Sequence, residues 1–426
     1  MRRSLGVVGA VALLLAAAPL ADAAPPRAGR FIVVLEDSAA SPAQVAAAHA
    51  GRFHLDVTAV YGSAIRGYAA KVPGAALAAL RADPRVASVS RDHPMRIQAQ
   101  ALPTGVNRIE GDLSSTRSGN GSGVVNATVA VIDTGIDVDH PELNVVGGKN
   151  CSTGSTFDDG NGHGTHVAGT IGARDDAVGV VGVAPGVRLF AVRVLNNFGS
   201  GTNSTVLCGI DFVDSRSPAK GGFIRVANMS IGGPGGDDGA CGSINGDVVH
   251  AAICRATADG VTFVAAAGNA HSTFDDQIPA AYDEVLTVTA VADMNGRPGG
   301  GAVGTCGGDV DDTAADFSNF ALAGSADATH SVAGPGACIR STWKGGVYKW
   351  LSGTSMATPH VTGAVALCIA TARCAGLTPA QIAQKVRADA AARPVTYGFV
   401  GDPSRPIAGP GGTTRFYGHL LYAAGY

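Results

Sequence analysis

The sequence predicts an α/β fold, a mostly parallel sheet with helices on both faces, preceded by a small α+β module. Beyond residue 105, short Val- and Ile-rich runs alternate with runs of helical length. The Val and Ile runs are nearly continuous, as in strands that are covered on both faces. Before residue 98, strand-like and helix-like segments alternate in a shorter stretch. Two folding units are therefore expected.

Composition excludes several classes of protein. The chain has 426 residues and a net charge of −3, and its 60 glycines follow no fixed period, which argues against collagen and against a disordered linker. Basic blocks and alternating aromatic and basic residues are missing from the sequence. We therefore expect no nucleic-acid partner, and a loop-rich globular enzyme fits the composition best.

The first residues have the features of an export signal. Arg2 and Arg3 precede an apolar run over residues 5–18, and Ala21, Asp22 and Ala23 supply the small-x-small pattern of a signal-peptidase site. Residues 1–23 are thus a predicted signal peptide. No later stretch has the length of an apolar membrane helix. We expect a secreted, extracellular protein that has no membrane association in its mature form.

The small module spans residues 30–97. Its strands are expected at "RFIVVLED", "GYAAKVPG" and "VASVSRD", and its two helices over residues 42–50 and 75–82. This order predicts one sheet covered by two helices. Residues 98–105 follow without periodicity and are predicted to be a linker that a protease can enter.

Residues 106–426 form the predicted larger domain. Strands are expected at "NATVAVIDTG", "VRLFAVRVL", "IRVANMSIGG", "VTFVAAAGN" and "VLTVTAVAD". Helices are expected at "HVAGT", "TNSTVLCGIDFVDSR", "GDVVHAAICRATADG" and "TSMATPHVTGAVALCIATA". Ligands bind beyond the carboxyl ends of parallel strands. Polar residues stand at three such ends, namely Asp133, Ser230 and Asn269.

Three short stretches supply the parts of a nucleophilic site. Ser355 begins a helix in "SGTSMATPH", His163 lies between two glycines in "GHGTHVAGT", and Asp133 ends the strand in "VIDTGID". A serine attacks efficiently when an imidazole takes its proton and a carboxylate orients that imidazole. Each residue alone is more often structural, since Asp and Ser commonly cap turns and helices.

The neighbouring residues have predicted roles as well. The helix N-terminus at Ser355 and the side chain of Asn269 are expected to donate hydrogen bonds to an oxyanion. His166 is expected to pack in its helix rather than act as the base, and His360 to face away from the Ser355 hydroxyl. The glycines that flank His163 are expected to leave room for a passing substrate backbone.

The four stretches "VAVIDTGID", "GHGTHVAGT", "AAGN" and "GTSMATPH", in this order, closely resemble the subtilisin-like serine proteases. The resemblance extends through most of residues 103–390 and is strongest to the secreted proteinase K-like branch. It implies a subtilisin-like fold and a serine endopeptidase that works through an acyl-enzyme. Asp133 would orient His163, His163 would be the base and acid, Ser355 the nucleophile and Asn269 an oxyanion donor. No cofactor is expected in the chemistry itself.

The resemblance also assigns the small module. Residues 30–97 resemble the ferredoxin-like inhibitory prodomain of these proteases, which would make the module an intramolecular inhibitor. A detachable folding template suits a parallel sheet, because distant strands must meet before their contacts offset the chain entropy. Self-cleavage is expected between about Arg96 and Ala101. The chain is expected to be a monomer.

Substrate contacts are expected on two segments. "NMSIGG" resembles the edge to which an extended polypeptide adds as a strand, and Ser230, Ile231 and Gly232 are the predicted contacts. Ala267 and Gly268, in "AAAG", are expected to line the opposite wall of the first specificity pocket. The small residues of both segments indicate a roomy apolar pocket.

A structural calcium site is a further expectation. The carboxylates of Glu142 and Asp176 match positions that hold calcium in many subtilases, with main-chain oxygens from Arg174, Val178 and Val180. The loop departs from the usual asparagine-rich form, because Arg174 precedes two aspartates there. A second acidic stretch, residues 309–316, is expected to be a surface loop.

All eight cysteines lie beyond residue 150. An even number in an exported chain favours disulfides. Eight cysteines allow many connectivities, and the sequence alone does not choose among them. If neighbours pair, the bonds are Cys241–Cys254, Cys306–Cys338 and Cys368–Cys374, which leaves Cys151 for Cys208.

The sequence also bears on alternatives to a peptidase. An inactive relative that binds peptides without cutting them is not favoured, because all three catalytic positions are intact. A dinucleotide-binding enzyme would need a GxGxxG between its first strand and helix, and the sequence has none there. An esterase or a peptidyl transferase stays open, because both use the same triad chemistry.

Overall fold

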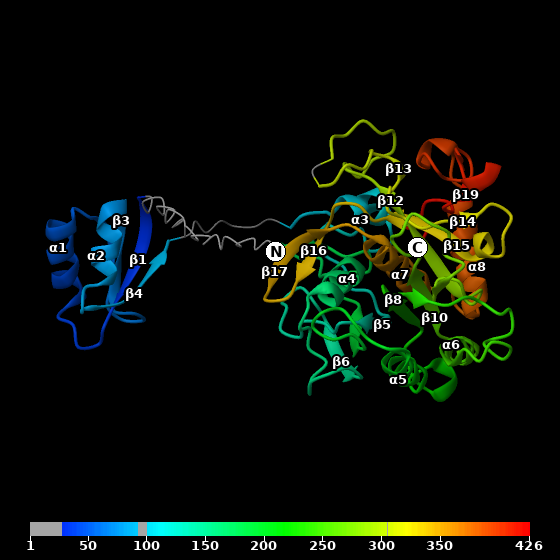
Figure 1. Cartoon of the computed structure of the whole chain (residues 1–426), viewed down its shortest axis with the longest axis horizontal. Helices are drawn as coiled ribbons and strands as arrows, with labels where there is room; N and C mark the ends of the chain where they lie inside the picture. Colours follow the sequence, from blue (N-terminus) through cyan, green and yellow to red (C-terminus); the bar gives the residue numbers. More distant parts are fainter. Residues whose placement is uncertain (1–27, 93–99, 305) are drawn as a thin grey trace, which may run out of the picture. The chain divides into compact units, whose positions relative to one another are not determined.

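The chain folds into two compact units, Met1–Ile97 and Gln98–Tyr426. The computed structural model shown in Figure 1 describes residues 28–92, 100–304 and 306–426. The predicted signal peptide lies outside the described residues. So does the predicted cleavage region, apart from Gln100 and Ala101 at its end.

The smaller unit is an antiparallel sheet with two helices, as predicted. Its strands have the order β2-β3-β1-β4. Their bounds are Gly29–Leu35 (β1), Asp56–Tyr61 (β2), Gly67–Val72 (β3) and Val86–Arg91 (β4), and the helices are Pro42–Phe53 (α1) and Leu77–Arg81 (α2). Phe31, Val33, Tyr68 and Leu80 are buried in its core. Strand β2 was not predicted, because all its residues stay at least partly exposed and form no apolar run.

The larger unit is built on a parallel sheet with the strand order β6-β7-β5-β8-β10-β12-β15, and β13 (Thr313–Ala314) adds antiparallel to β12. The parallel strands are Thr128–Asp133 (β5), Val145–Asn150 (β6), Arg188–Arg193 (β7), Val226–Met229 (β8), Thr262–Ala266 (β10), Val285–Ala292 (β12) and Ser331–Pro335 (β15). All six residues of β5 are buried, which explains its continuous apolar sequence.

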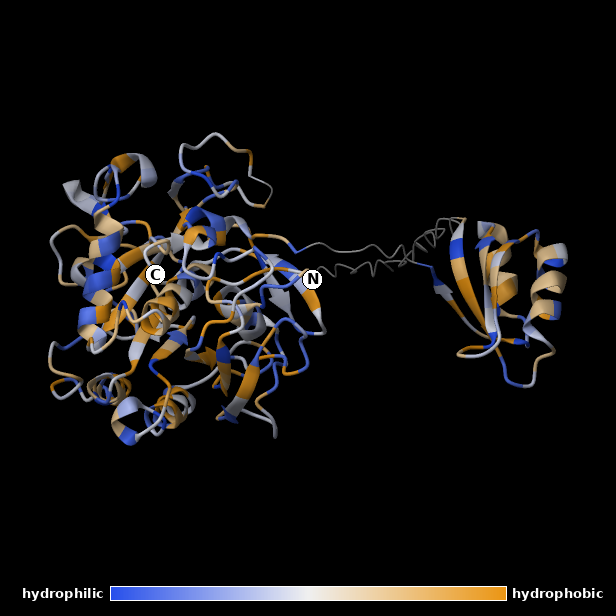
Figure 2. Cartoon of the chain, turned by 180° about the vertical axis from the view of Figure 1, so that it is seen from behind, coloured by the Kyte–Doolittle hydropathy of each residue, from blue (hydrophilic) through white to orange (hydrophobic). Residues whose placement is uncertain are grey.

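Helices cover both faces of this sheet (Figure 1). They are His163–Gly172 (α4), Asn203–Asp214 (α5), Val248–Ala258 (α6), Thr354–Ala370 (α7) and Pro379–Ala391 (α8). Alternate residues of β5 enter opposite cores, Val129 and Val131 on the side of α4, α7 and α8, and Ala130 and Ile132 on the side of α5 and α6. Figure 2 shows hydrophobic colouring along the central strands.

Several strands of the larger unit were not predicted from the sequence. Strand β6 has two glycines, and the antiparallel pair Ile339–Trp343 (β16) and Val347–Leu351 (β17) contains few continuous apolar residues. The glycine- and proline-rich C-terminal segment packs onto the domain. Its strand Thr414–Phe416 (β19) pairs with Ala321–Leu322 (β14), and Tyr426 is 3% exposed.

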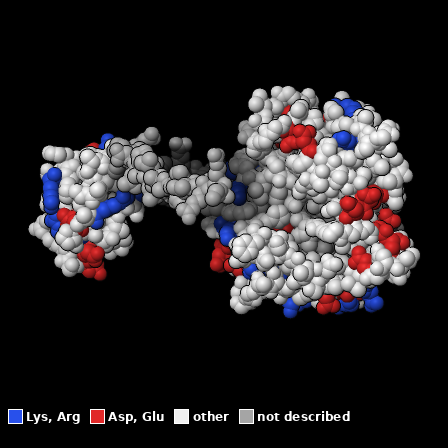
Figure 3. Space-filling model, viewed as in Figure 1, with Lys and Arg blue, Asp and Glu red and all other residues white. Residues whose placement is uncertain are grey.

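The disulfide prediction is confirmed in the structure. The four bonds are Cys151–Cys208, Cys241–Cys254, Cys306–Cys338 and Cys368–Cys374, and all of them lie in the larger unit. Within the described ranges, no helix is both long and apolar enough to cross a bilayer. Most of the surface drawn in Figure 3 belongs to uncharged residues.

The acidic stretch at residues 309–316 differs from the prediction of a surface loop. Asp311 and Asp312 are each 4% exposed. Asp312 accepts hydrogen bonds from the buried Arg108 guanidinium, and Asp311 accepts from the backbone N–H groups of Met294 and Ala302. The two carboxylates were mistaken for solvated ones because their partners are distant in sequence.

Candidate active site

Two of the predicted catalytic side chains meet at the carboxyl end of β5. The Nδ1 atom of His163 lies 2.8 Å from Oδ1 and 3.0 Å from Oδ2 of Asp133. Asp133 is fully buried as the last residue of the strand, whereas the side chain of His163, the first residue of α4, is 26% exposed. The carboxylate and the imidazole therefore form a hydrogen-bonded pair, and their catalytic roles stay predictions.

The turn before His163 is fixed by a second carboxylate, that of Asp159. Its Oδ1 accepts from the backbone N–H groups of Asn161 and Gly162, and its Oδ2 accepts from the backbone and hydroxyl of Thr165. Asp159 is 6% exposed. These bonds orient the N-terminus of α4 and with it the imidazole. The role of Asp159 was not predicted from the sequence.

The charge of Asp133 determines the basicity of His163. Burial lowers the pKa of the imidazole, but the negative charge and hydrogen bond of Asp133, with the charge of Asp159, outweigh burial and hold this pKa above 6.5. The bond to Nδ1 also leaves Nε2 as the nitrogen that can accept a proton.

The glycines beside His163 have a packing role. Gly162 has a φ of +115°, and a Cβ there would lie 2.3 Å from the ring of Trp343. A Cβ at Gly164 would lie 2.1 Å from the carbonyl oxygen of Gly135. Neither position has space for a side chain, so close protein packing requires both glycines. The sequence had suggested a different reason for these glycines, namely room for a passing substrate backbone.

Ser355 is the second residue of α7, at a helix N-terminus as predicted. Its hydroxyl donates to the backbone carbonyl of Ser230 at 3.1 Å, and its own carbonyl accepts from the Ser230 hydroxyl at 2.9 Å. Among the hydrogen bonds of the described residues, none joins Ser355 to His163. The predicted hydrogen bond between the Ser355 hydroxyl and the imidazole is therefore not present in the structure, because the hydroxyl donates to the Ser230 carbonyl instead.

Asn269 lies beside the start of α7. Its Oδ1 accepts from the backbone N–H of Thr354 at 2.8 Å and from the Thr354 hydroxyl at 3.0 Å. Asn269 is exposed, so its amide Nδ2 remains available to a ligand next to Ser355. Thr354 positions this amide, a role that the sequence reasoning missed.

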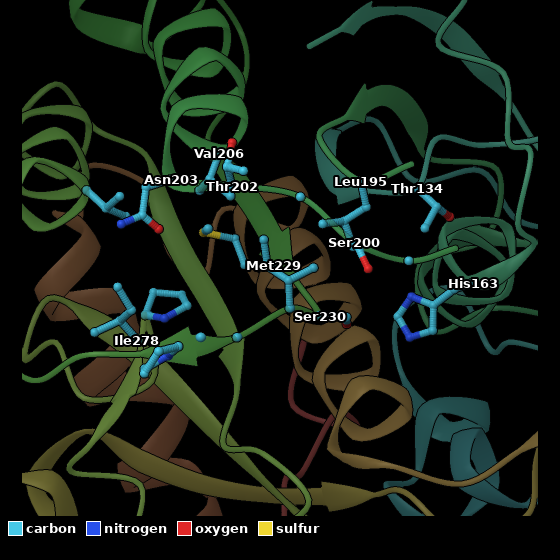
Figure 4. A pocket seen from close by; sticks show the side chains of 18 of the residues that line it. Thr134, His163, Leu195, Ser200, Thr202, Asn203, Val206, Met229, Ser230 and Ile278 are labelled. Atoms are coloured by element: carbon cyan, nitrogen blue, oxygen red, sulfur yellow. The ribbon is translucent and has the colours of Figure 1, made fainter. Parts of the chain in front are cut away.

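A cleft of about 550 Å³ runs beside His163. The predicted substrate residues Ser230, Ile231 and Gly232 line it. Figure 4 shows His163 and Ile278 on opposite sides of this cleft. Residues 199–201, which follow β7, also line it and were missed, although two glycines around a serine between a strand and a helix were a usable signal.

Ala267 and Gly268 are placed differently. Neither of them lines this cleft, and Ala267 is fully buried. Gly268 donates its N–H to the Thr354 hydroxyl at 3.1 Å, and a Cβ there would lie 2.5 Å from the Asn319 amide. Their contact with substrate stays a prediction.

The other two predicted histidine positions agree with the structure. His166 is fully buried in α4, its Nε2 lies 3.0 Å from the carbonyl of Ile339, and burial lowers its pKa to about 3. His360 is also fully buried, and its Nδ1 lies 2.9 Å from the carbonyl of Met356. Neither imidazole bonds to Ser355.

The residues of the predicted calcium site come together in one loop region. Glu142 is 2% exposed, its Oε1 accepts from the Tyr348 hydroxyl, and its buried Oε2 has no hydrogen-bond partner among the described residues. Burial raises the pKa of Glu142 to about 7. A Cβ at Gly179 would lie 2.4 Å from Oε1 of Glu142, so the Glu142 carboxylate reaches the loop that contains Asp176.

An amide that was not predicted also reaches this region. The side chain of Gln100 donates to the carbonyl oxygens of Arg174, at 2.8 Å, and Val180, at 3.3 Å. Two of the predicted main-chain ligands therefore converge on one point. Asp176 is exposed and accepts from the N–H of Val178, a residue that is itself 50% exposed. The oxygen-rich set fits a calcium ion.

Comparison with known proteins identifies the family. The model of the Subtilase family matches residues 125–426, and that of Peptidase inhibitor I9 matches residues 30–98. This chain belongs to the subtilase family. As a subtilase it is a serine endopeptidase, and its I9 inhibitor domain implies that it is made as a zymogen.

Individual relatives agree with this assignment. Subtilisin E of Bacillus subtilis (strain 168) is 38% identical to this subtilase over 304 residues, 70% of this chain and 69% of that protein. Subtilisin DY of Bacillus licheniformis is 38% identical over 273 residues, 63% of this chain and 85% of that protein. The crystal structure of a cold adapted subtilisin-like serine proteinase superposes with a TM-score of 0.54 at 32% identity, covering 75% of this chain and 97% of that one.

Proposed function

We propose that this subtilase is secreted and hydrolyses extended polypeptides through an acyl-enzyme on Ser355. The observation that carries the proposal is the bond between His163 and Asp133 at the edge of a cleft lined by Ser230, Ile231 and Gly232. The buried carboxylate stabilises the imidazolium that forms when Nε2 takes the serine proton.

In the first step, rotation about the Cα–Cβ bond of Ser355 moves its hydroxyl from the Ser230 carbonyl to His163 Nε2. The oxygen then attacks the scissile carbonyl as Nε2 takes the proton, and His163 returns this proton to the leaving amine. The Asn269 amide and the N–H of Ser355 at the helix N-terminus donate to the oxyanion. Water then attacks the acyl-enzyme by the same route.

Residues 1–23 are proposed to direct export, and residues 30–97 to inhibit the catalytic domain, residues 106–426, until the linker over residues 98–105 is cut. Four disulfides support an oxidising compartment. The partners are extended polypeptides and the chain's own prodomain, with a monomer as the working form.

Expression of the full chain tests this function. The wild-type chain is expected to be cut between about Arg96 and Ala101 and to release a catalytic domain that degrades casein. The Ser355→Ala chain is expected to stay uncut, because self-cleavage needs the nucleophile. Normal maturation of Ser355→Ala in a preparation free of other proteases would disprove self-processing, and hydrolysis of simple esters without any cleavage of casein would favour the esterase alternative.

A further inference from the structure

A second cluster of titratable groups surrounds His250 in α6, outside the site described above. The side chain of His250 is 1% exposed, and its ring stacks on Tyr282 with centroids 4.1 Å apart and planes 3° from parallel. Its Nε2 lies 2.9 Å from Oε2 of Glu284. Since a carboxylate only accepts, this bond places a proton on Nε2.

The other ring nitrogen has no such partner. His250 Nδ1 is buried without a hydrogen bond among the described residues, and it lies 3.6 Å from Oδ1 of Asp237 and 3.6 Å from Oδ1 of Asp238. Both separations are too long for a hydrogen bond. In its neutral form, with the proton on Nε2, His250 would direct a lone pair at two carboxylates. A cation between the three atoms would turn this repulsion into attraction.

The two carboxylates are held in place by their own loop. Asp238 accepts from four backbone N–H groups, and Asp237 accepts from those of Gly239 and Asp283. The disulfide Cys241–Cys254 ties this loop to α6. The three candidate ligand atoms lie within 4.8 Å of one another. Their arrangement therefore does not depend on flexible surface side chains.

We propose that His250 Nδ1, Asp237 Oδ1 and Asp238 Oδ1 bind a divalent transition-metal ion of the zinc class, with water as the fourth ligand. Zinc bonds of about 2.0–2.2 Å in a tetrahedron separate the ligand atoms by roughly 3.4 Å, close to the two separations at His250. A mixed imidazole and carboxylate set suits zinc better than calcium.

Glu284 is a positioning residue in this site. A carboxylate that accepts the far N–H of a metal-binding imidazole fixes its tautomer and makes it a stronger ligand. The ion would hold the loop of Asp237 and Asp238 on α6. Because this loop follows strand Gly233–Pro234 (β9), which continues from the cleft residues Ser230, Ile231 and Gly232, the ion would stiffen the substrate edge.

Zinc binding to the full chain tests the site directly. We would use the Ser355→Ala chain to prevent self-digestion, strip it with a chelator, saturate it with calcium and confirm the four disulfides by mass spectrometry. Calorimetric titration with Zn²⁺ is expected to show one tight site and a higher melting temperature. Co²⁺ in place of zinc is expected to give the visible absorption of a tetrahedral nitrogen and oxygen site.

Variants decide which residues bind. His250→Gln is expected to abolish the tight site, and Glu284→Gln to weaken it by about 10- to 100-fold. His330→Gln is the matched control. The His330 Nε2 is also buried without a hydrogen bond, beside Asp283 and Asp327 at 3.7 and 3.8 Å, but in the described part of the chain these three groups do not converge within 4.8 Å.

Zinc binding by the two variants decides whether His250 is a ligand. Loss of one zinc in His250→Gln and its retention in His330→Gln would support the site. An absence of saturable zinc binding, or equal binding by both variants, would overturn it. If His250→Gln does not fold, as judged by its melting transition without metal, an unchanged affinity in Glu284→Gln would overturn the proposal instead.

Discussion

Asn269 presents the oxygen of its amide to the protein and leaves the nitrogen exposed beside the start of α7. Thr354 donates two hydrogen bonds to Oδ1, so the Nδ2 group has a fixed orientation beside Ser355. A donor held in place before the reaction needs no reorganisation when negative charge develops on the substrate oxygen. Asn269 therefore acts on the transition state more than on substrate binding.

Asn269→Ala is expected to lower kcat by about 10²- to 10³-fold with little change in KM, a magnitude that is known from this same family. Steady-state kinetics on a chromogenic peptide measures it. Thr354→Val is the control, because it keeps Nδ2 but removes one of the bonds that orient it, and a smaller loss is expected. An unchanged kcat in Asn269→Ala would remove this residue from the oxyanion site.

The raised pKa of His163 sets the acidic limit of activity. Only neutral His163 accepts the serine proton, so kcat/KM rises as the pH rises through this pKa, which lies above 6.5. Asp133→Asn removes the charge that raises the pKa of His163. The rise of kcat/KM on the acidic side of the pH profile is therefore expected to move to lower pH. The kcat of this variant is expected to be about 10⁴-fold lower than that of the wild type. If the acidic side of the pH profile does not shift in this variant, it does not report the titration of His163 beside Asp133.

At the residue scale, sequence motifs predicted the paired side chains but not their surroundings. Asp133 and His163 were predictable because each lies in a stretch with a typical pattern. Asp159, Thr354 and Gln100 were not, because each acts through contacts that only folding creates. The bond of Ser355 to the Ser230 carbonyl was missed for the same reason.

At the element scale, burial decided which strands were predictable. Strands β5 and β12 are buried along their whole length and therefore have continuous apolar sequences. Strand β6 lies at the sheet edge, contains Gly147 and Gly148, and has no such run. Helices α5 and α6 were predicted close to their observed bounds because their apolar residues recur with helical spacing.

The loop over residues 174–180 is the element that calcium is expected to stabilise. An ion bound by Glu142, Asp176 and the main-chain oxygens of Arg174, Val178 and Val180 would connect this loop to the segment after β5. Thermal unfolding of the Ser355→Ala chain in calcium and in chelator tests this, and a lower melting temperature in chelator is expected. Glu142→Gln is expected to reduce this difference. An identical midpoint in both buffers would mean that these oxygens bind no ion.

At the scale of the whole molecule, the two units differ in how they are stabilised. The larger unit has all four disulfides and a core on each face of its sheet, whereas residues 28–92 of the smaller unit have a single core between the sheet and two helices. The division was predictable from the change in periodicity and from the positions of the cysteines. The packing of the C-terminal segment was not, because its short strands pair with partners far away in sequence.

Covalent labelling of the mature enzyme with an organofluorophosphate reports whether folding brings an activated serine and a histidine together. We expect one label per chain, on Ser355, and loss of the label in His163→Ala. An active preparation that carries no label, or carries it on another residue, would show that Ser355 is not the nucleophile.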